Sequence, residues 1–239
     1  APNAAEARGR RMAAQAVACP HADTEGLRLA PPGPEELEVA AAMAAIALAD
    51  SPPYAFACGG SAVAREGVLR TLFARNMWVA HRQGCCWGAY EEEALVCFFM
   101  LVPQGVGSPT PSICDLLRSG IFESLLRLGL RATLALARIT AWAETAELDL
   151  LQGRTVLRLE GMVVRPSRQR QGIGTKALRA ALRVADESGL EVFLATQEAN
   201  SVPFYRRLDF EVVREEAYAP AGFVTWFMLR PVGGAGATA

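Results

Sequence analysis

The stretch from residue 156 to residue 188 constrains the fold most strongly. A β-strand pattern passes there through a basic, glycine-bearing loop directly into a helical pattern. The first turn of such a helix presents backbone N–H groups without intrahelical partners, at the positive end of the helix dipole. Gly172 and Gly174 carry no side chain that would keep a phosphate from these amides, and Arg168 and Arg170 add positive charge. The stretch therefore predicts a strand–loop–helix unit that binds a phosphate-bearing ligand.

The spacing excludes two familiar phosphate-binding loops. The Walker A pattern GxxxxGK[ST] is absent, and Lys176 lies beyond the glycines. The Rossmann pattern GxGxxG is not completed at Ala177, and no second β–α half follows. The loop must therefore belong to another class of fold that contains both helices and strands.

The rest of the chain alternates between strand and helix periodicity. Strands are expected at residues 26–30, 85–90, 94–101, 156–165, 191–197, 210–215 and 222–229, and helices at 35–49, 62–82, 172–188 and 200–208. A further helical segment at 112–150, bent near Gly120 and Gly129, separates the third strand from the fourth. Residues 51–53 (Ser-Pro-Pro) are expected to end the first helix. The domain is expected to span residues 26–231, between a tail at 1–25 and another at 232–239.

Charge and cysteine content limit the partners and the compartment. The formal net charge of -1 provides no strong field for nucleic acid or an anionic membrane, so we expect neither as a partner. The six cysteines form no CxxC pair, which favours reduced thiols and a cytoplasmic location. Cys19 and His21 fall short of a complete zinc ligand set, so no metal is expected. The Ala-rich and Arg-bearing tail at 1–25 leaves organelle import as an alternative to plain disorder.

The same loop also carries a family resemblance. Val164-Arg165-Pro166, followed by Gln169-x-x-Gly172-x-Gly174, resembles the GCN5-related N-acetyltransferase (GNAT) superfamily. The match continues in residues 192–194, which resemble its fifth strand, and in residues 200–210, NSVPFYRRLDF, which resemble a helix of that family. The layout is most similar to the puromycin N-acetyltransferase group. Asp209 stands where the family has glycine, so we expect a left-handed backbone there.

The resemblance implies an α/β, GNAT-type fold. Such a fold has a central, mostly antiparallel mixed sheet of about seven strands flanked by helices, with residues 112–150 as an insertion between the third and fourth strands. It also implies acetyl-CoA as the acyl donor. The residues that would hold this donor are Met162, Val163, Val164, Gln169, Arg170, Gln171, Gly172, Ile173, Gly174, Thr175 and Asn200 or Ser201.

Two residues are candidates for the proton transfers. By resemblance, Tyr205 would protonate the departing thiolate, and the alternative is plain aromatic packing beside Phe204 and Phe210. Glu160 would be the general base; the alternative is a surface or ion-paired role with Arg158 or Arg165. Strand alternation would place Glu160 on one face together with the second and fourth residues after it, Met162 and Val164.

Further acids provide weaker candidates. Glu198 lies on a loop, and Ala195 stands where many relatives carry a catalytic glutamate. The acidic turn at 91–93 either attracts a cationic amine or is a solvated hairpin tip. The favoured activity is acetylation of a primary amine on a small molecule. The alternatives are a non-catalytic acyl-CoA binding module and acetylation of protein N-termini or lysines, and the sequence does not give the oligomeric state.

Overall fold

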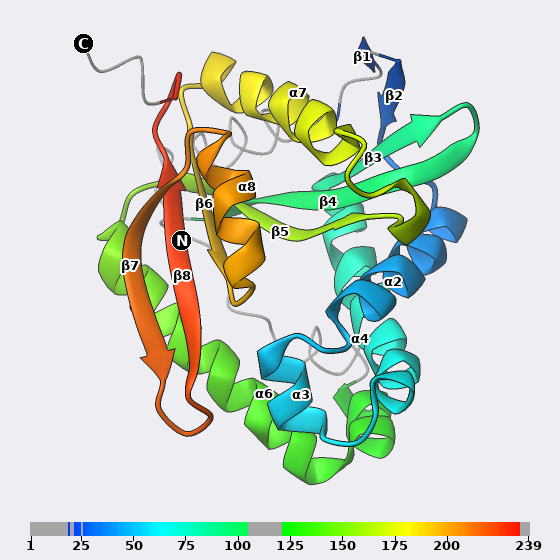
Figure 1. Ribbon diagram of the computed structural model, residues 1–239, viewed down its shortest axis with the longest axis vertical. Coiled ribbons are helices and arrows are strands. Elements are labelled where there is room, and N and C mark those ends of the chain that lie inside the picture. Colours follow the sequence, from blue (N-terminus) through cyan, green and yellow to red (C-terminus); the bar gives the residue numbers. More distant parts are fainter. Residues whose placement is uncertain (1–18, 20–21, 25, 105–120, 235–239) are drawn as a thin grey trace, which may run out of the picture.

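The computed structural model describes residues 19, 22–24, 26–104 and 121–234, which form one mixed sheet flanked by helices (Figure 1). The eight strands lie in the order β1-β2-β3-β4-β5-β6-β8-β7. They are β1 (Ala22–Thr24), β2 (Leu27–Ala30), β3 (Cys86–Glu91), β4 (Ala94–Gln104), β5 (Val156–Val164), β6 (Glu191–Thr196), β7 (Glu211–Tyr218) and β8 (Phe223–Arg230). Among these strands β5 and β6 are the one parallel pair, so the expected mostly antiparallel sheet is confirmed.

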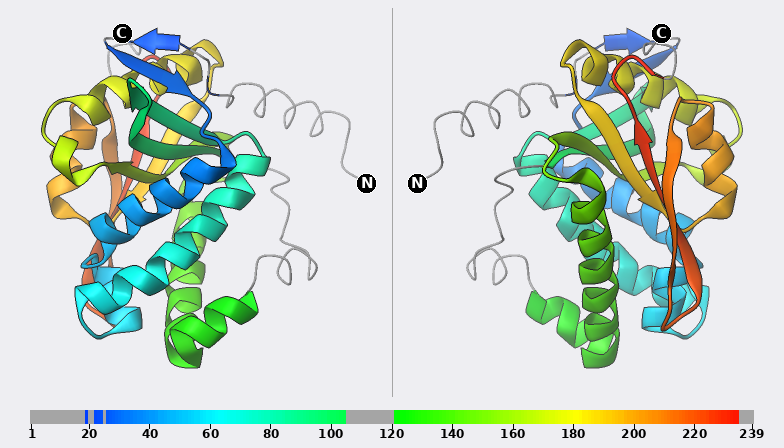
Figure 2. Two further views of the ribbon diagram at one scale, coloured as in Figure 1. Left: turned by 90° about the vertical axis from the view of Figure 1, so that its right-hand side faces the viewer. Right: turned by 90° about the vertical axis from the view of Figure 1, so that its left-hand side faces the viewer.

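The helices divide between the two faces of the sheet. They are α2 (Pro34–Leu48), α3 (Pro52–Cys58), α4 (Ala62–Arg82), α6 (Ile121–Leu151), α7 (Ile173–Glu187) and α8 (Val202–Arg206), with the 3-10 turns η1 (Pro166–Arg168) and η2 (Ala199–Ser201). Helices α2 and α4 lie side by side on one face (Figure 2), where the Cys86 sulfur of β3 is 3.5 Å from the Met77 carbonyl oxygen of α4. Helix α7 packs on the opposite face of β5, at Met162 and Val164.

Helix α6 is the expected insertion, and it reaches across the molecule. It bends at Gly129, where φ is 74°, as the sequence predicts. Its C-terminal part buries Ala146 and Leu151 against apolar side chains of β5, β6 and β8. Trp142 donates a 3.2 Å hydrogen bond to Glu216 of β7 and packs 5.2 Å from the Tyr218 ring. The helix thereby spans the junction between β5 and β6.

Helix α3 is a difference from the sequence prediction. Residues 51–53 were expected only to end the preceding helix, yet Pro52 and Pro53 occupy the first turn of a new one. Proline is suited to that turn because its missing N–H would have no intrahelical partner there. The sequence therefore folds into a short extra helix between α2 and α4.

The N-terminal boundary also differs. Strand β1 and the buried Cys19 lie inside the segment expected to be a tail, and β1 pairs with β2 through Ala22 opposite Leu29. Backbone pairing and the burial of one thiol hold this segment to the sheet edge. The rest of the tail before residue 26, the loop and early insertion at 105–120, and residues 235–239 lie outside the described residues.

In the described part of the chain, no single helix is long and apolar enough to cross a membrane. Helices α2 and α3 meet that length and composition test only as a pair bent by 89°.

Candidate functional site

The two parallel strands separate along their length. Only Val156, Leu157 and Arg158 of β5 pair with β6, opposite Glu191, Val192 and Phe193. Strand β5 then continues to Val164 with β4 as its one paired strand among the described residues. The backbone groups of β5 that point away from β4 there have no strand partner. We call this unpaired stretch between β5 and β6 the opening, and an extended ligand could satisfy its backbone groups as a strand would.

A β-bulge at Gly161 changes which side chains share a face. Phe98 of β4 lies opposite Val163, and Met100 lies opposite Glu160, so one residue of β4 faces two of β5. Gly161 takes the left-handed conformation this requires, with φ 59°. Glu160 therefore shares a face with Val163. The expectation that Glu160, Met162 and Val164 lie on one face was wrong, because simple alternation does not allow for a bulge.

The N-terminus of α7 lies beside this stretch of β5. Gly172 precedes the helix with φ 79°, and a Cβ placed on it would meet nothing within 4 Å. No side chain caps the helix, so its first N–H groups, from Ile173, Gly174 and Thr175, face outward. A Cβ on Gly174 would lie 3.2 Å from both Met162 and Val164. Gly174 thus lets α7 approach β5 closely, while Gly172 keeps the helix end accessible.

Polar side chains hold the loop before α7 in shape. The amide of Gln169 donates to the Val164 carbonyl oxygen at 3.1 Å, and that of Gln171 donates to the Ser167 carbonyl oxygen at 3.3 Å. Arg170 is exposed, with φ 60°. Arg168, expected to add charge for a phosphate, instead forms an ion pair with Glu91 at the tip of the β3–β4 hairpin. Arg170 is therefore the arginine of this loop that remains available to an anion among the described residues.

Tyr205 lies on the same face as Met162 and Val164. It sits on α8 in edge-to-face contact with Phe204 at 5.0 Å and Phe210 at 5.7 Å. Burial, together with the nearby Cys97 thiol, raises the pKa of Tyr205 to about 12. The phenol therefore stays protonated, and its hydroxyl has no hydrogen-bond partner among the described residues.

The turns on either side of α8 contain Asn200 and Ser201 before the helix and Asp209 after it. Asn200 and Ser201 lie in η2 directly before the helix, with Asn200 exposed and Ser201 half-buried. Asp209 follows the helix with φ 65°, as its substitution for glycine predicts. The residues predicted to hold acetyl-CoA thus lie on β5, on the loop and first turn of α7, and, after β6, on η2.

Glu160 points to the opposite face, toward Tyr54 of α3 and Glu147 of α6. Its carboxylate lies 2.5 Å from Arg158 Nε. Arg165, the other expected partner, instead donates to the Leu95 carbonyl oxygen at 2.8 Å and 3.1 Å. Burial raises the pKa of Tyr54 on α3 to about 12, and the Glu160 charge contributes to that rise. Glu160 is thus ion-paired to Arg158 and lies near Tyr54.

The other candidate acids are placed less favourably. Glu91 of the acidic turn is paired with Arg168, and Glu93 lies 3.6 Å from Arg28. The turn therefore uses two of its three carboxylates within the fold. Glu198 is half-buried on the loop after β6, and Ala195 is exposed. Within the described residues, no group of three or more His, Cys, Asp or Glu side chains could hold a metal ion.

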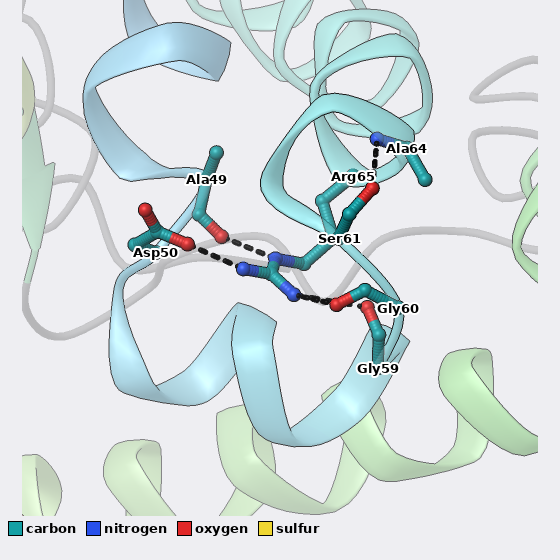
Figure 3. Close-up of polar contacts among 7 residues, drawn as sticks. All are labelled: Ala49, Asp50, Gly59, Gly60, Ser61, Ala64 and Arg65. Atoms are coloured by element: carbon teal, nitrogen blue, oxygen red, sulfur yellow. Dashed lines mark hydrogen bonds and ion pairs between the residues drawn. The ribbon is translucent and has the colours of Figure 1, made fainter.

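Helix α3, on the face of Glu160, is fixed by Arg65 of α4 (Figure 3). The Arg65 side chain is buried and donates to the carbonyl oxygens of Ala49, Gly59 and Gly60 at 2.5, 3.1 and 2.6 Å. It also pairs with Asp50 at 2.5 Å. One guanidinium therefore joins the end of α2, both ends of α3 and the start of α4, which sets the position of Tyr54.

Sequence reasoning missed three residues that shape this face: Tyr54, Arg65 and Glu147. The paired prolines before Tyr54 are a helix-start signal that could have revealed α3. Glu147 of α6 lies 3.1 Å from Arg158 and is 4% exposed, whereas its neighbour Leu148 is 67% exposed. Hydrophobic periodicity predicts the reverse, so no sequence pattern indicated that Glu147 is buried.

Comparison with known proteins agrees with this geometry. The family model described as "Acetyltransferase (GNAT) family" matches residues 54–210. No curated protein sequence matches the chain significantly.

Solved structures share the fold at low sequence identity. One is described as arylalkylamine N-acetyltransferase 7 of the yellow fever mosquito Aedes aegypti (TM-score 0.63, 15% identity, covering 86% of this chain and 87% of that one). Another is the Drosophila melanogaster polyamine N-acetyltransferase (TM-score 0.54, 13% identity, covering 86% of this chain and 99% of that one). A third is described as "histone acetyltransferase HPA2 and related acetyltransferase" from Corynebacterium glutamicum (TM-score 0.58, 12% identity, covering 87% of this chain and 97% of that one). The particular similarity to the puromycin N-acetyltransferase group stays a prediction. The separated parallel strands, the uncapped helix after a glycine loop and the family match over most of the chain together show that this protein belongs to the GNAT acetyltransferase family.

Proposed function

We propose that this enzyme transfers the acetyl group of acetyl-CoA to a primary amine of a small molecule, by direct attack in a ternary complex. The observation that carries the proposal is the opening between β5 and β6, which has an uncapped helix end on one face and an acidic side chain on the other. A donor bound along β5 from the α7 face would present its thioester to an acceptor on the Glu160 face.

The donor-side residues fit acetyl-CoA. The diphosphate would accept hydrogen bonds from the N–H groups at the start of α7, beside the open position at Gly172. Arg170 would add a positive charge there. The pantetheine arm would pair with the backbone of residues 162–164, and Asn200 or Ser201 would bond it from η2.

The chemistry divides between the two faces. The amine must be neutral to attack, so Glu160 would accept its proton directly or through one water. A strand amide of β5 would stabilise the tetrahedral oxyanion. The pKa of Tyr205, about 12, lies above the reference value of about 8.5 for a thiol. Tyr205 would therefore stabilise the departing thiolate by donating a hydrogen bond to the sulfur, and the proton would stay on the phenol, which has the higher pKa.

The acceptor side favours a small cationic amine. Glu160 and Glu147 place two carboxylates there against the single guanidinium of Arg158. Helix α6 reaches this face through the Glu147–Arg158 pair and α3 through Tyr54 near Glu160, and α6 belongs to an insertion in the chain. The similar structures named for arylalkylamines and polyamines, one of them forming N-acetylagmatine, are consistent with this class of acceptor.

Steady-state release of the CoA thiol tests the proposal. We would assay agmatine, polyamines and arylalkylamines against peptides with a free N-terminus or lysine, at equal amine concentration. Turnover that is faster with small amines supports the proposal. Turnover with peptides alone would point to protein acetylation, and acetyl-CoA binding without any turnover would point to a binding module.

A further inference from the structure

The carboxylate of Glu147 is buried between α6 and the sheet. Its residue is 4% exposed, and its Oε2 lies 3.1 Å from Arg158 NH1. Its Oε1 is buried and has no hydrogen-bond partner among the described residues. Burial raises the pKa of Glu147, and the nearby Arg158 offsets that rise only in part. An acid in such a position is costly to the fold unless it serves a purpose.

Arg158 connects this buried acid to Glu160. Its Nε lies 2.5 Å from Glu160 Oε1 and its NH1 lies 3.1 Å from Glu147 Oε2. Glu147 comes from α6, whereas Arg158 and Glu160 are alternate residues on one face of β5. One guanidinium is thus held between two carboxylates from different elements, and the three charges sum to that of a single carboxylate.

This arrangement has a chemical consequence for a base. A guanidinium in direct contact favours the ionised form of a carboxylate and so weakens it as a proton acceptor. A second carboxylate on the far side of the guanidinium opposes that effect. The second carboxylate also fixes the plane of the Arg158 guanidinium, because Nε of this rigid group contacts Glu160 while NH1 contacts Glu147.

We propose that Glu147 is a positioning residue for Glu160: it offsets the charge of Arg158 and fixes the guanidinium that orients the catalytic carboxylate. The inference rests on the proposed function, in which Glu160 accepts the proton of the amine. It assigns to α6 a part in the reaction beyond covering the acceptor side.

Other titratable groups near Glu160 carry no competing charge. Tyr54 from α3 and Cys85, just before β3, face Glu160, and burial raises their pKa values to about 12 and about 11. Both groups therefore remain neutral across the range of an ordinary assay. Glu144, one turn before Glu147 on α6, is exposed to solvent, which screens its charge. Arg158 is thus the charged group in direct contact with Glu160, and Glu147 is in direct contact with Arg158.

Glu147→Gln in the full chain tests the inference through the pH dependence of kcat/KM. The substitution removes one charge and keeps the size of the side chain. The Arg158 charge then lacks one of its two carboxylates and acts more strongly on Glu160, so we expect the acid limb to move to lower pH by about half a unit or more. The plateau kcat should fall at least about fivefold, and KM for acetyl-CoA should not change. Glu144→Gln, on the same helix, should leave the profile in place.

The double variant Glu147→Gln, Arg158→Met separates charge from folding. It removes both members of the buried pair, so neither is left buried and unpaired. The acid limb should return to its wild-type pH or higher, while kcat stays at least about fivefold low because Glu160 is no longer oriented. If the single variant does not fold, the double variant tests the inference in its place. A kcat equal to that of the wild type in the double variant would overturn the inference.

The two claims can fail separately. If Glu160→Gln moves the acid limb up to the pKa of the amine but Glu147→Gln leaves both limb and kcat unchanged, then Glu147 only attaches α6 to β5 and the inference is wrong. If Glu160→Gln itself changes neither rate nor profile, Glu160 is not the base, and the proposed mechanism fails first.

Discussion

At the scale of single residues, the position of Gly161 determines how the site is arranged. Its left-handed backbone permits the bulge that sends Glu160 to one face of β5 and Met162 and Val164 to the other. Tyr205 lies with the second pair, beside Cys97. The proposed acid and the proposed base therefore approach the opening between the strands from opposite sides, as a reaction between two separately bound substrates requires.

Tyr205→Phe keeps the ring contacts with Phe204 and Phe210 and removes only the hydroxyl. We expect kcat to fall about 100-fold or more, within the range for loss of a general acid, because the leaving thiolate loses its donor. Acetyl-CoA affinity, measured by calorimetry, should stay unchanged. A kcat within about twofold of the parent would instead assign Tyr205 to aromatic packing alone.

Glu160→Gln retains size and hydrogen-bonding reach but cannot accept the proton of the amine. The rate loss should be largest near neutral pH and should shrink as pH approaches the pKa of the amine, where the substrate deprotonates unaided. Rate profiles for both enzymes over the same pH range provide the measurement. An equal loss at every pH would show a positioning role, and no loss would direct attention to Glu198 or to bulk solvent.

At the scale of elements, two helices define the two sides of the site. Helix α7 reaches β5 closely because Gly174 has no side chain, and Gly172 leaves the helix end open. Helix α3 is held on the other side by Arg65, whose contacts are all with backbone carbonyls and Asp50. Each helix can therefore be perturbed by one substitution without touching the other.

Gly172→Asp places a negative charge at the helix end that would receive the diphosphate. Acetyl-CoA affinity should fall at least about tenfold, or about 1.4 kcal/mol, with the fold retained. Gly172→Ala is the matched control, because it imposes a side chain at φ 79° without a charge. Calorimetry on both variants checks this, and unchanged affinity in the Asp variant would remove the phosphate assignment.

Arg65→Met should loosen α3 and affect the acceptor more than the donor. It leaves three carbonyl oxygens without their donor, so we expect a loss of about 2–4 kcal/mol in the free energy of unfolding. KM for the amine should rise severalfold, and KM for acetyl-CoA should not. Arg70→Met, an exposed arginine of the same helix, is the control. Equal changes in both KM values would contradict the assignment of α3 to the acceptor side.

At the scale of the whole molecule, side-chain contacts fasten the far ends of the sheet to the helices that cross it. Trp142 of α6 packs on the β7–β8 hairpin, and Asp186 of α7 forms a two-point ion pair with Arg230 at the end of β8. Arg230 is 5% exposed, so its charge depends on that partner. These contacts hold the β6–β8–β7 half of the sheet to α6 and α7, although β5 and β6 separate beyond Arg158.

Asp186→Asn should destabilise the protein by about 2 kcal/mol at neutral pH, because it weakens the partner of a buried charge. Burial by itself would raise the pKa of Asp186. The hydrogen bonds from Arg230 and Gly233 outweigh burial and lower this pKa below its usual value. The contribution of the Asp186 carboxylate to the free energy of unfolding is therefore present above about pH 4. It is lost as pH falls through the lowered pKa of the folded state. Denaturant unfolding of both proteins should give a difference that shrinks below about pH 4. A difference that does not depend on pH would contradict the ion-pair explanation.

The sequence by itself determined what is local. Hydrophobic periodicity placed nearly every strand and helix, and the Val164–Gly174 motif indicated the family, because these features depend on neighbours along the chain. Local pattern did not reveal the helix that begins at Pro52.

The tertiary structure decided what depends on pairing between distant segments. The bulge at Gly161 exists only against β4, and the choice of Arg158 over Arg165 as the partner of Glu160 follows from that register. The burial of Glu147 beside the exposed Leu148 arises because α6 packs against β5 at Val156 and Arg158. No periodicity within one segment encodes such contacts, since each requires two segments that fold together.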